Sequence, residues 1–364
     1  MADGGRDEDR IARLRLARTP HIGPVSYRQL LRRFGDAVTA LAAIPELAAR
    51  GGGRAPLPCR REDAEREFAR VAALGARHLF LEEPDYPAPL AELDDAPPAL
   101  ILRGSVALLD RPVVAMVGAR NASAAACRFA RMLARGLADE GVTVVSGLAR
   151  GIDTAAHLGS IEGGTVGVIA SGIDIAYPPE NAELQERIAR EGLLVAEQPP
   201  GREPLARHFP RRNRIIAGLA LGTVVVEAAP KSGSLITARM AADAGREVMA
   251  VPGSPLDQRA QGCNLLIREG ATLVQSAADI VEAVRPIDPR MRQDRAAWTG
   301  PPAVYDAGAA DRALVTELLG PVPVPVDELI RLSGLAPAIV QLVLLELELA
   351  GRLERHAGSR VSIA

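Results

Sequence analysis

Small, hydroxyl-bearing and basic residues recur directly after short apolar runs in the middle of this 364-residue chain. Gly118 and Arg120 follow one such run, and Ser146 and Gly147 end the next. A glycine lets a ligand approach the backbone, and the forked guanidinium group of arginine matches two oxygens of a phosphate. Ligands of an open parallel sheet bind at the carboxyl ends of its strands, so these residues are expected to line one crevice that favours phosphate.

Residues 209–214 bring aromatic and cationic groups to the same predicted crevice. They combine one ring, three guanidinium groups and an amide, from Phe209, Arg211, Arg212, Asn213 and Arg214. Single-stranded nucleic acid is bound by this mixture, because rings stack on bases while cations follow the backbone. An alternative role for one of these arginines is structural, in an ion pair with Glu227 or Asp174 inside the fold. At least one of the three arginines is therefore expected to be structural, and at least one to face the ligand.

The run from Lys231 to Thr237 places small hydroxyl residues ahead of a predicted helix. Ser232, Gly233 and Ser234 at a helix N-terminus would form an anion site, through free amide groups and the helix dipole. Lys231 is the only lysine of the chain, and ligand contact and an ordinary surface position are equally open for it. The G-x-x-x-x-G-K-[S/T] spacing of nucleotide hydrolases is absent, so this loop gives no support for hydrolysis.

Asp153 and His157 lie four residues apart at the start of another predicted helix. Their spacing puts both on one helix face, but no partnered nucleophile and no H-E-x-x-H metal pattern accompanies them. Asp153 is interpreted as a helix cap, and the two residues as a structural hydrogen-bonded pair rather than a catalytic base.

Alternating apolar runs and helical stretches predict the elements that position these loops. Expected strands are 113–117, 143–146, 165–170, 193–196, 223–227, 248–251 and 272–274, and expected helices are 124–140, 154–162, 182–191, 215 onward and 235–244. Strands this short and apolar on both faces are typical of a buried parallel sheet, and the alternation predicts right-handed, doubly wound connections. Prolines between 84 and 98 exclude regular helix or central strand there, and 99–104 is expected to be an edge strand.

Smaller domains are predicted at both ends of the chain. Residues 1–58 are expected to be helical, and the turn 22–25 fits a helix–hairpin–helix, although a purely structural helical domain is favoured. Gly51, Gly52 and Gly53 are interpreted as a flexible joint. The central domain is placed at 59–285 and a polar linker at 286–310.

The last predicted domain, 311–364, has the outline of a winged helix. Helices are expected over 326–332 and 337–350, followed by a hairpin over 353–363. Several acidic residues of this region argue against strong binding to duplex DNA, among them Asp327, Glu328, Glu346, Glu348 and Glu354. A protein-contact or regulatory role is at least as well supported.

Composition excludes several classes of protein. The chain is 48% hydrophobic and 24% charged, with a formal net charge of −2, so it carries no global signal for nucleic acid. A local basic patch is expected instead, because five arginines lie between 202 and 214 against one acid. No apolar run reaches transmembrane length, the N-terminus is too charged for a secretory signal, and the three cysteines lack metal spacing. A cytoplasmic protein without a metal or other cofactor is expected.

The order of these motifs resembles the DprA/Smf family of DNA-processing proteins. The resemblance rests on residues 118–120, 146–157, 171–174 with 177–178, 209–219, 227–228, 232–238, 245–248, 251–253 and 262–267. Any one block alone is weak, whereas their joint order is specific. The similarity covers about 111–285 densely, and the two ends only in outline.

The resemblance implies an extended Rossmann-type domain that binds single-stranded DNA as a homodimer and has no catalytic activity. It further implies protection of the strand and its transfer to the RecA recombinase in natural transformation or recombination. By position, it implies DNA contact for Arg120 and a crevice lined by Phe209, Arg212, Asn213, Arg214 and the Ser-Gly-Ser loop. Tyr177 is the second ring expected to take a base.

The chain departs from the family pattern at three places. Ala124 and Ala125 stand where the family often has Tyr-Gly, Gln198 stands where a tyrosine is common, and Cys263 replaces a small hydroxyl residue. Fewer tyrosines mean less stacking or packing surface, so the affinity for DNA is expected to differ from that of relatives.

Two alternatives stay open. The first is a nucleotide-processing Rossmann enzyme of the LOG phosphoribohydrolase type, whose strand-end anion loops would look similar. Its P-G-G-x-G-T-x-x-E signature is absent, and residues 231–237 stand roughly in its place. The second is an adaptor whose C-terminal domain binds a protein and whose crevice is vestigial.

Overall fold

The computed structural model describes residues 2–285, 306–356 and 358–364. The chain forms two compact units. One runs from Glu67 to the end of the central domain, and the other joins the residues up to Arg66 to the described residues from Asp306 onward. The predicted boundaries of the four domains stay a prediction, and most of the predicted linker 286–310 lies outside the described residues.

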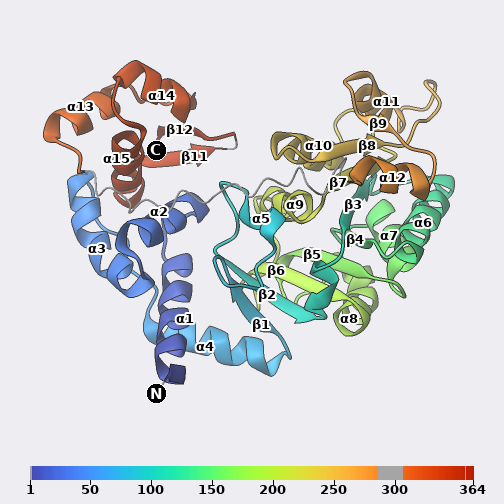
Figure 1. The fold of residues 1–364 in the computed structure, drawn as a ribbon, viewed down its shortest axis with the longest axis horizontal. Coiled ribbons are helices and arrows are strands. Elements are labelled where there is room, and N and C mark those ends of the chain that lie inside the picture. Colours follow the sequence, from blue (N-terminus) through green and yellow to red (C-terminus); the bar gives the residue numbers. More distant parts are fainter. Residues whose placement is uncertain (1, 286–305, 357) are drawn as a thin grey trace. The chain divides into compact units, whose positions relative to one another are not determined.

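The larger unit is built on a nine-stranded sheet of order β1-β2-β6-β5-β4-β3-β7-β8-β9 (Figure 1). Its strands are β1 Arg77–Phe80, β2 Ala99–Gly104, β3 Val113–Gly118, β4 Thr143–Ser146, β5 Thr165–Gly172, β6 Leu193–Gln198, β7 Gly222–Val226, β8 Glu247–Ala250 and β9 Thr272–Leu273. The seven strands from β3 to β9 pair in parallel, as the sequence predicts. Strand β2 is second from the edge rather than at it, because β1, which the sequence analysis missed, pairs with it antiparallel.

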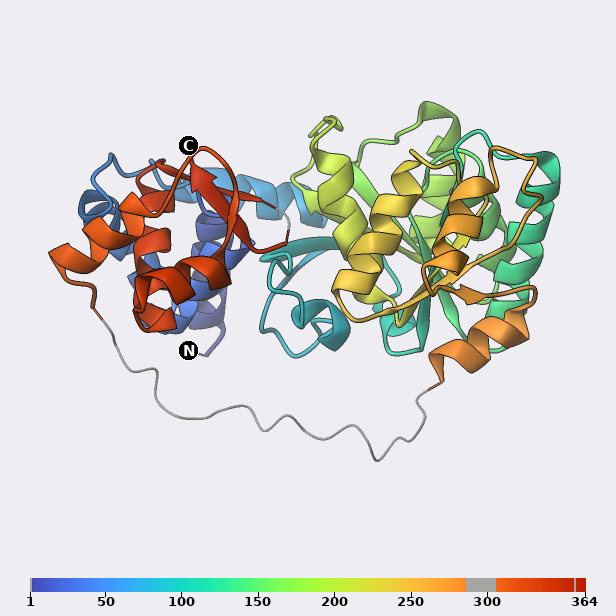
Figure 2. The same ribbon diagram turned by 90° about the horizontal axis from the view of Figure 1, so that it is seen from above.

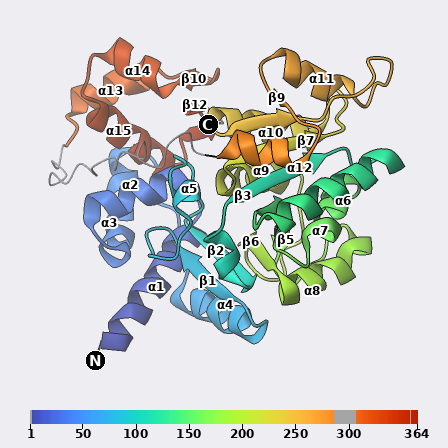
Figure 3. The ribbon, with the colours of Figure 1, turned by 45° about the vertical axis from the view of Figure 1, so that its right-hand side comes forward.

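Helices cover both faces of this sheet (Figure 3). The helices α6 Ala124–Asp139, α7 Ile152–Ser160 and α8 Ala182–Glu191 lie on one face, and α9 His208–Leu219 and α10 Gly233–Asp243 on the other. The remaining helices of this unit are α5 Ala88–Ala91, α11 Gln261–Arg268 and α12 Ala277–Val284, and α4 Arg61–Ala73 crosses the boundary between the units. From β3 the chain winds outward through β4, β5 and β6, and then returns to place β7 on the other side of β3. The topological switch point of the sheet therefore lies at the carboxyl ends of the neighbouring strands β3 and β7.

The apolar runs that predicted the strands form the core between sheet and helices. Val114, Met116, Val144, Val224 and Val226 of the sheet pack with Leu133 and Leu137 of α6 and Ile152 of α7. Each is almost fully removed from water, which is the main favourable contribution to folding of this unit. A rigid sheet of this kind fixes the positions of the loops at its carboxyl edge.

The smaller unit combines the two ends of the chain (Figure 2). Its N-terminal helices are α1 Ala2–Arg18, α2 Pro24–Phe34 and α3 Ala37–Arg50, and its C-terminal elements are α13 Ala309–Glu317, β10 Val324–Pro325, α14 Val326–Ser333, α15 Pro337–Leu349, β11 Leu353–His356 and β12 Arg360–Ile363. Strands β10, β12 and β11 form a three-stranded sheet. The predicted fold class is confirmed, with an extended Rossmann-type parallel sheet, a small helical N-terminal domain and a C-terminal winged helix.

The interpretation of Gly51, Gly52 and Gly53 as a flexible joint is wrong. Their amide groups close a hydrogen-bonded turn after α3, by donating to the carbonyl oxygens of Leu47, Ala49 and Ala48. Gly51 is buried and packs against the C-terminal part of the chain. Among the described helices, no single one has the length and apolar composition needed to cross a bilayer.

Candidate nucleic-acid interface

The loops after β3, β4 and β7 meet at the switch point of the sheet. Gly118 pairs with Val226 at the ends of β3 and β7, and the Ala119 amide donates to the Glu227 carbonyl oxygen at 2.7 Å. A Cβ atom on Gly118 would lie 2.1 Å from the Val226 carbonyl oxygen, so a glycine is required there by this close packing. The predicted convergence of the strand-end loops after β3 and β7 is therefore present.

Arg120, Phe209 and Tyr177 come together although they lie on three different segments. The Arg120 guanidinium carbon lies 5.4 Å from the centroid of the Phe209 ring, a cation–π distance. The Phe209 and Tyr177 rings lie 5.6 Å apart at an interplanar angle of 57°. Arg120 is exposed, and Tyr177 is 46% exposed. These three side chains, called here the Arg120–Phe209–Tyr177 cluster, present a cation and two rings on the surface.

Residues 209–214 form the first turns of α9, so the helix expected from residue 215 onward begins earlier, at His208. Pro210 is compatible with a helix here, because the first turn has no internal partner for its missing amide hydrogen. The helical twist sends neighbouring side chains in different directions. Arg211 is exposed and Asn213 half-buried, whereas Arg212 and Arg214 are each only 7% exposed.

Arg212 braces the loop after β4 from inside the protein. Its Nη1 donates to the carbonyl oxygen of Gly147, and to that of Val168 at 2.7 Å. Burial lowers the pKa of Arg212 to about 10, while the nearby Asp153 carboxylate opposes this shift. A Cβ atom on Gly147 would collide with the guanidinium group at 2.0 Å, so the glycine makes room for it.

Arg214 is also turned inward, but its partners differ from those expected from the sequence. Its Nη2 pairs with Glu197 at 2.5 Å, and its Nη1 donates to the Asp95 carbonyl oxygen. The expected partners are engaged elsewhere, since Asp174 pairs with Arg70 and Glu227 accepts hydrogen bonds from Ser123. Of the three arginines of this segment, Arg211 alone is exposed.

Ser146 and Gly147 lie inside the protein as well. The Ser146 hydroxyl donates to the Met116 carbonyl oxygen at 2.6 Å. The amide of Gly147 donates to Asp153 at 3.2 Å, as does that of Ala149 at 3.3 Å. The Asp153 carboxylate thus takes the position that an external anion would need at this loop. Burial raises the pKa of Asp153, and the Arg212 guanidinium opposes that shift.

Asp153 and His157 each form hydrogen bonds with other partners instead of the bond expected between them. The His157 Nδ1 atom lies 2.7 Å from the Thr165 hydroxyl. Burial, with a smaller effect from Arg212, lowers the pKa of His157 to about 3, so the ring is neutral at physiological pH. The interpretation of Asp153 as a helix cap is wrong, because Gly151 is the N-cap residue of α7. Both residues have structural contacts, but they do not form the predicted pair.

A protein carboxylate also covers the N-terminus of α6. Glu227 accepts hydrogen bonds from the amide of Ser123 at 2.8 Å and from its hydroxyl at 2.6 Å. Ser123 is the residue that caps α6, so the negative charge lies at the positive end of the helix dipole. An external phosphate would have to displace Glu227 to bind there.

The N-terminus of α10 is open by comparison. Ser232 caps the helix, and its hydroxyl lies 2.7 Å from that of Ser234. A Cβ atom on Gly233 would have no neighbour within 4 Å, and Lys231 is exposed. Small hydroxyls and a lysine at this helix N-terminus can receive an anion without displacing a protein carboxylate.

Further arginines surround the cluster, and the sequence analysis did not select them as site residues. Arg202 and Arg207 are exposed, and together with Arg211 they add to the effect of burial that lowers the pKa of His208. Arg150 is exposed and forms an ion pair with Glu180. The sequence contained a signal for each of them, because Arg202 and Arg207 belong to the predicted basic patch and Arg150 lies inside the motif 146–157. Among the described residues, no group of three or more potential ligands could hold a metal ion.

Comparisons with known proteins agree with this architecture. The family model for DNA recombination-mediator protein A matches residues 77–285, that for a DprA-like N-terminal HHH domain matches 7–69, and that for a DprA winged helix domain matches 299–359. The DNA processing protein DprA of Streptococcus pneumoniae is 47% identical over 198 residues, which cover 54% of this chain and 70% of that protein. Protein Smf of Synechocystis is 36% identical over 314 residues, covering 78% of this chain and 79% of that protein.

Two solved structures resemble this protein over more than half of its chain. The structure of DNA processing protein A from Streptococcus pneumoniae has a TM-score of 0.58 and 42% identity, covering 61% of this chain and 77% of that one. A DNA processing protein A from Helicobacter pylori, described for its unique single-stranded DNA binding mode, has a TM-score of 0.52 and 29% identity, covering 56% of this chain and 94% of that one.

Proposed function

Because this chain belongs to the DprA/Smf family of DNA-processing proteins, we propose that it binds single-stranded DNA, without turnover, at the carboxyl edge of its central sheet. The observation that carries this proposal is the Arg120–Phe209–Tyr177 cluster. Two rings offer stacking surfaces that any base can use, and Arg120 supplies a cation for the adjacent phosphate. The single-stranded DNA binding of the Helicobacter pylori relative supports the same ligand here.

The other site residues divide by their position into two roles. Arg120, Tyr177, Phe209, Arg211, Asn213, Lys231, Ser232, Gly233 and Ser234 are proposed to contact the strand or to lie beside it. Gly118, Ser146, Gly147, Arg212 and Arg214 are proposed to hold the walls of the site, because they are packed or hydrogen-bonded inside the protein. The open N-terminus of α10 would take a second phosphate of the same strand.

The family further suggests what the bound strand is for. We infer that the protein protects incoming or recombining strands in the cytoplasm, forms a homodimer, and loads the RecA recombinase in transformation and recombination. A dimer would align two sites along one strand and raise affinity through effective concentration. Light scattering tests the dimer, and the lag of RecA filament assembly on coated DNA, with and without this protein, tests the loading.

The binding site is tested by fluorescence anisotropy with labelled oligo-dT at low salt. Arg120→Ala removes one charge-assisted contact of about 1.5 kcal/mol, so affinity should fall about tenfold and the salt slope by about 0.7. Phe209→Ala removes a stacking surface of about 1–3 kcal/mol per base and should weaken binding at least about fivefold.

Arg190→Ala is the matched control for this test. Arg190 is exposed in the last turn of α8, away from the Arg120–Phe209–Tyr177 cluster, so the affinity should stay within about twofold of the parent. Unchanged binding of both Arg120→Ala and Phe209→Ala would refute the proposed site. No binding of the parent protein to any oligonucleotide would instead favour the adaptor alternative.

A further inference from the structure

Most of the helix that a winged helix uses to read DNA is buried in this protein, and only its first turn has exposed residues. In a helix–turn–helix, the second helix lies in the major groove and needs an accessible polar or basic face. Here that helix is α15, in which residues 342–349 are all buried. Its sequence from Pro337 to Leu349 contains two glutamates and no lysine or arginine. This helix is therefore suited to a protein partner and unsuited to a phosphate-lined groove.

The partner on α15 is the N-terminal helical domain of the same chain. Helix α3 and the glycine turn after it pack against α15 within the smaller unit. A Cβ atom on Gly51 would lie 2.1 Å from the Glu346 carbonyl oxygen, and one on Gly53 would lie 2.3 Å from that of Ala350. Gly51 has an ordinary right-handed helical conformation, so the neighbouring helix, and not the backbone angle, requires a glycine.

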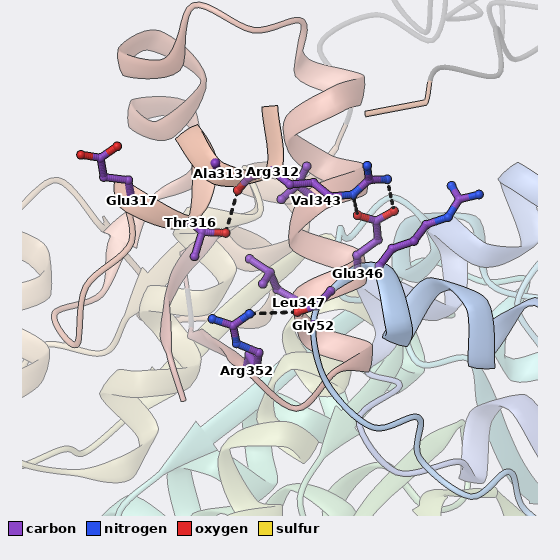
Figure 4. Close-up of a pocket in the computed structure, with 11 residues that line it drawn as sticks. Gly52, Arg312, Ala313, Thr316, Glu317, Val343, Glu346, Leu347 and Arg352 are labelled. Atoms are coloured by element: carbon purple, nitrogen blue, oxygen red, sulfur yellow. Dashed lines mark hydrogen bonds and ion pairs between the residues drawn. The ribbon is translucent and has the colours of Figure 1, made fainter. Parts of the chain in front are cut away.

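Two carboxylates of α15 are buried and paired within the smaller unit. Glu346 is fully buried and pairs with Arg312 of α13 through two hydrogen bonds, of 2.7 and 2.8 Å (Figure 4). Arg352 beside it donates to the Gly51 carbonyl oxygen at 3.1 Å (Figure 4). The pair with Arg312 compensates the negative charge of the buried Glu346 carboxylate, and the bond from Arg352 links α15 to the turn after α3.

Glu348 reaches the turn that would contact DNA in a helix–hairpin–helix. Its Oε2 accepts hydrogen bonds from the Ser26 hydroxyl and from Arg355 Nε, the latter at 2.7 Å. Its Oε1 would lie 3.6 Å from a Cβ atom on Gly23, the N-cap residue of α2. The first turn of α2 is thus covered by a carboxylate of α15, at the position where a helix N-terminus attracts phosphate.

We propose that the C-terminal winged helix is an intrachain docking module that closes over the N-terminal helices. In the closed unit neither the buried part of α15, residues 342–349, nor the turn before α2 is available to duplex DNA. The two ends of the chain form one stable body, held by non-covalent contacts that do not depend on the connecting segment. This inference is independent of the single-stranded DNA site on the central sheet.

The test uses the full chain with a site-specific protease site inserted between residues 285 and 306. After cleavage of the folded protein, the fragment from 306 onward should co-elute with the fragment up to 285 in size-exclusion chromatography. Gly51→Ala combined with Gly53→Ala should weaken this association about tenfold or more, because each new methyl group overlaps a backbone carbonyl of the partner. Gly320→Ala is the control, since a Cβ atom there meets nothing within 4 Å.

Two results would overturn the proposal. One is separation of the parent fragments after cleavage while both keep their circular dichroism. The other is release of the C-terminal fragment by an excess of duplex DNA, which would make α15 accessible to DNA. Oligo-dT binding by the central unit is measured in the same samples, and unchanged oligo-dT affinity in the glycine variants shows that the rest of the protein is folded.

Discussion

Arg212 gives the sharpest test of how the site is built, because the family resemblance places it at the DNA and the structure places it inside the protein. Arg212→Ala removes the hydrogen bonds to the Gly147 and Val168 carbonyl oxygens and the positive charge beside Asp153. Removing one member of a buried charged pair costs about 3–5 kcal/mol. For a unit of this size each kcal/mol lowers the melting temperature by about 2–4 °C, so a decrease of about 6–20 °C is expected.

Scanning calorimetry of the full chain measures this change, and Arg211→Ala is the matched control. Arg211 is the exposed neighbour on the same helix, so its removal should change stability by less than about 0.5 kcal/mol while it weakens oligo-dT binding. The destabilisation by Arg212→Ala should also grow with pH. Burial already raises the pKa of Asp153 in the folded protein, and loss of Arg212 raises it further. As pH rises above the unfolded pKa of Asp153, the free energy of unfolding should therefore decrease more in the variant than in the parent.

A particular pair of results would refute this assignment of Arg212. If Arg212→Ala melts like the parent protein but binds oligo-dT at least about tenfold more weakly, Arg212 contacts the strand directly. The bracing of the loop after β4 would then be of little energetic importance.

Three further predictions concern other parts of the larger unit. Burial lowers the pKa of His157 to about 3, so the free energy of unfolding should decrease as pH falls below the unfolded pKa of about 6.5. In urea denaturation, His157→Gln should reduce this pH dependence, and a variant with the same pH profile as the parent would contradict the burial argument. Gly233→Asp should place a negative charge at the open N-terminus of α10 and weaken oligo-dT binding at least about threefold, whereas Gly233→Ala should not; equal affinities would remove α10 from the site. Incubation with AMP should release no adenine above a buffer blank, since the LOG-type signature is absent, and release would favour the enzyme alternative.

Much of the fold could be predicted from local patterns in the sequence. The strand predicted at 143–146 matches β4 at both ends, and the helix predicted at 182–191 matches α8. Short runs that are apolar on both faces specify buried parallel strands, and the alternation with helices leaves few topologies to consider. The edge strand β1, Arg77–Phe80, was missed because two of its four residues, Arg77 and His78, are polar and give no apolar run like those of the other strands.

The direction of individual side chains could not be predicted in the same way. The sequence placed Arg211, Arg212 and Arg214 together, but their roles depend on α9 beginning at His208 and on which carbonyl oxygens and carboxylates lie beneath it. Those partners come from residues 17 to 119 positions away along the chain, and no local pattern contains them. Only the packed sheet decides which guanidinium group is satisfied internally and which stays in solvent.

The sequence by itself determined the α/β alternation, the winged-helix outline and the set of basic and aromatic residues, because these depend on periodicity and residue type within short windows. Tertiary structure decided the rest: that Arg120, Phe209 and Tyr177 meet, and that Glu348 bonds to Ser26 at the opposite end of the chain. Both outcomes depend on contacts between residues tens to hundreds of positions apart. Such contacts are selected by the burial of the whole apolar surface, to which every element contributes at once.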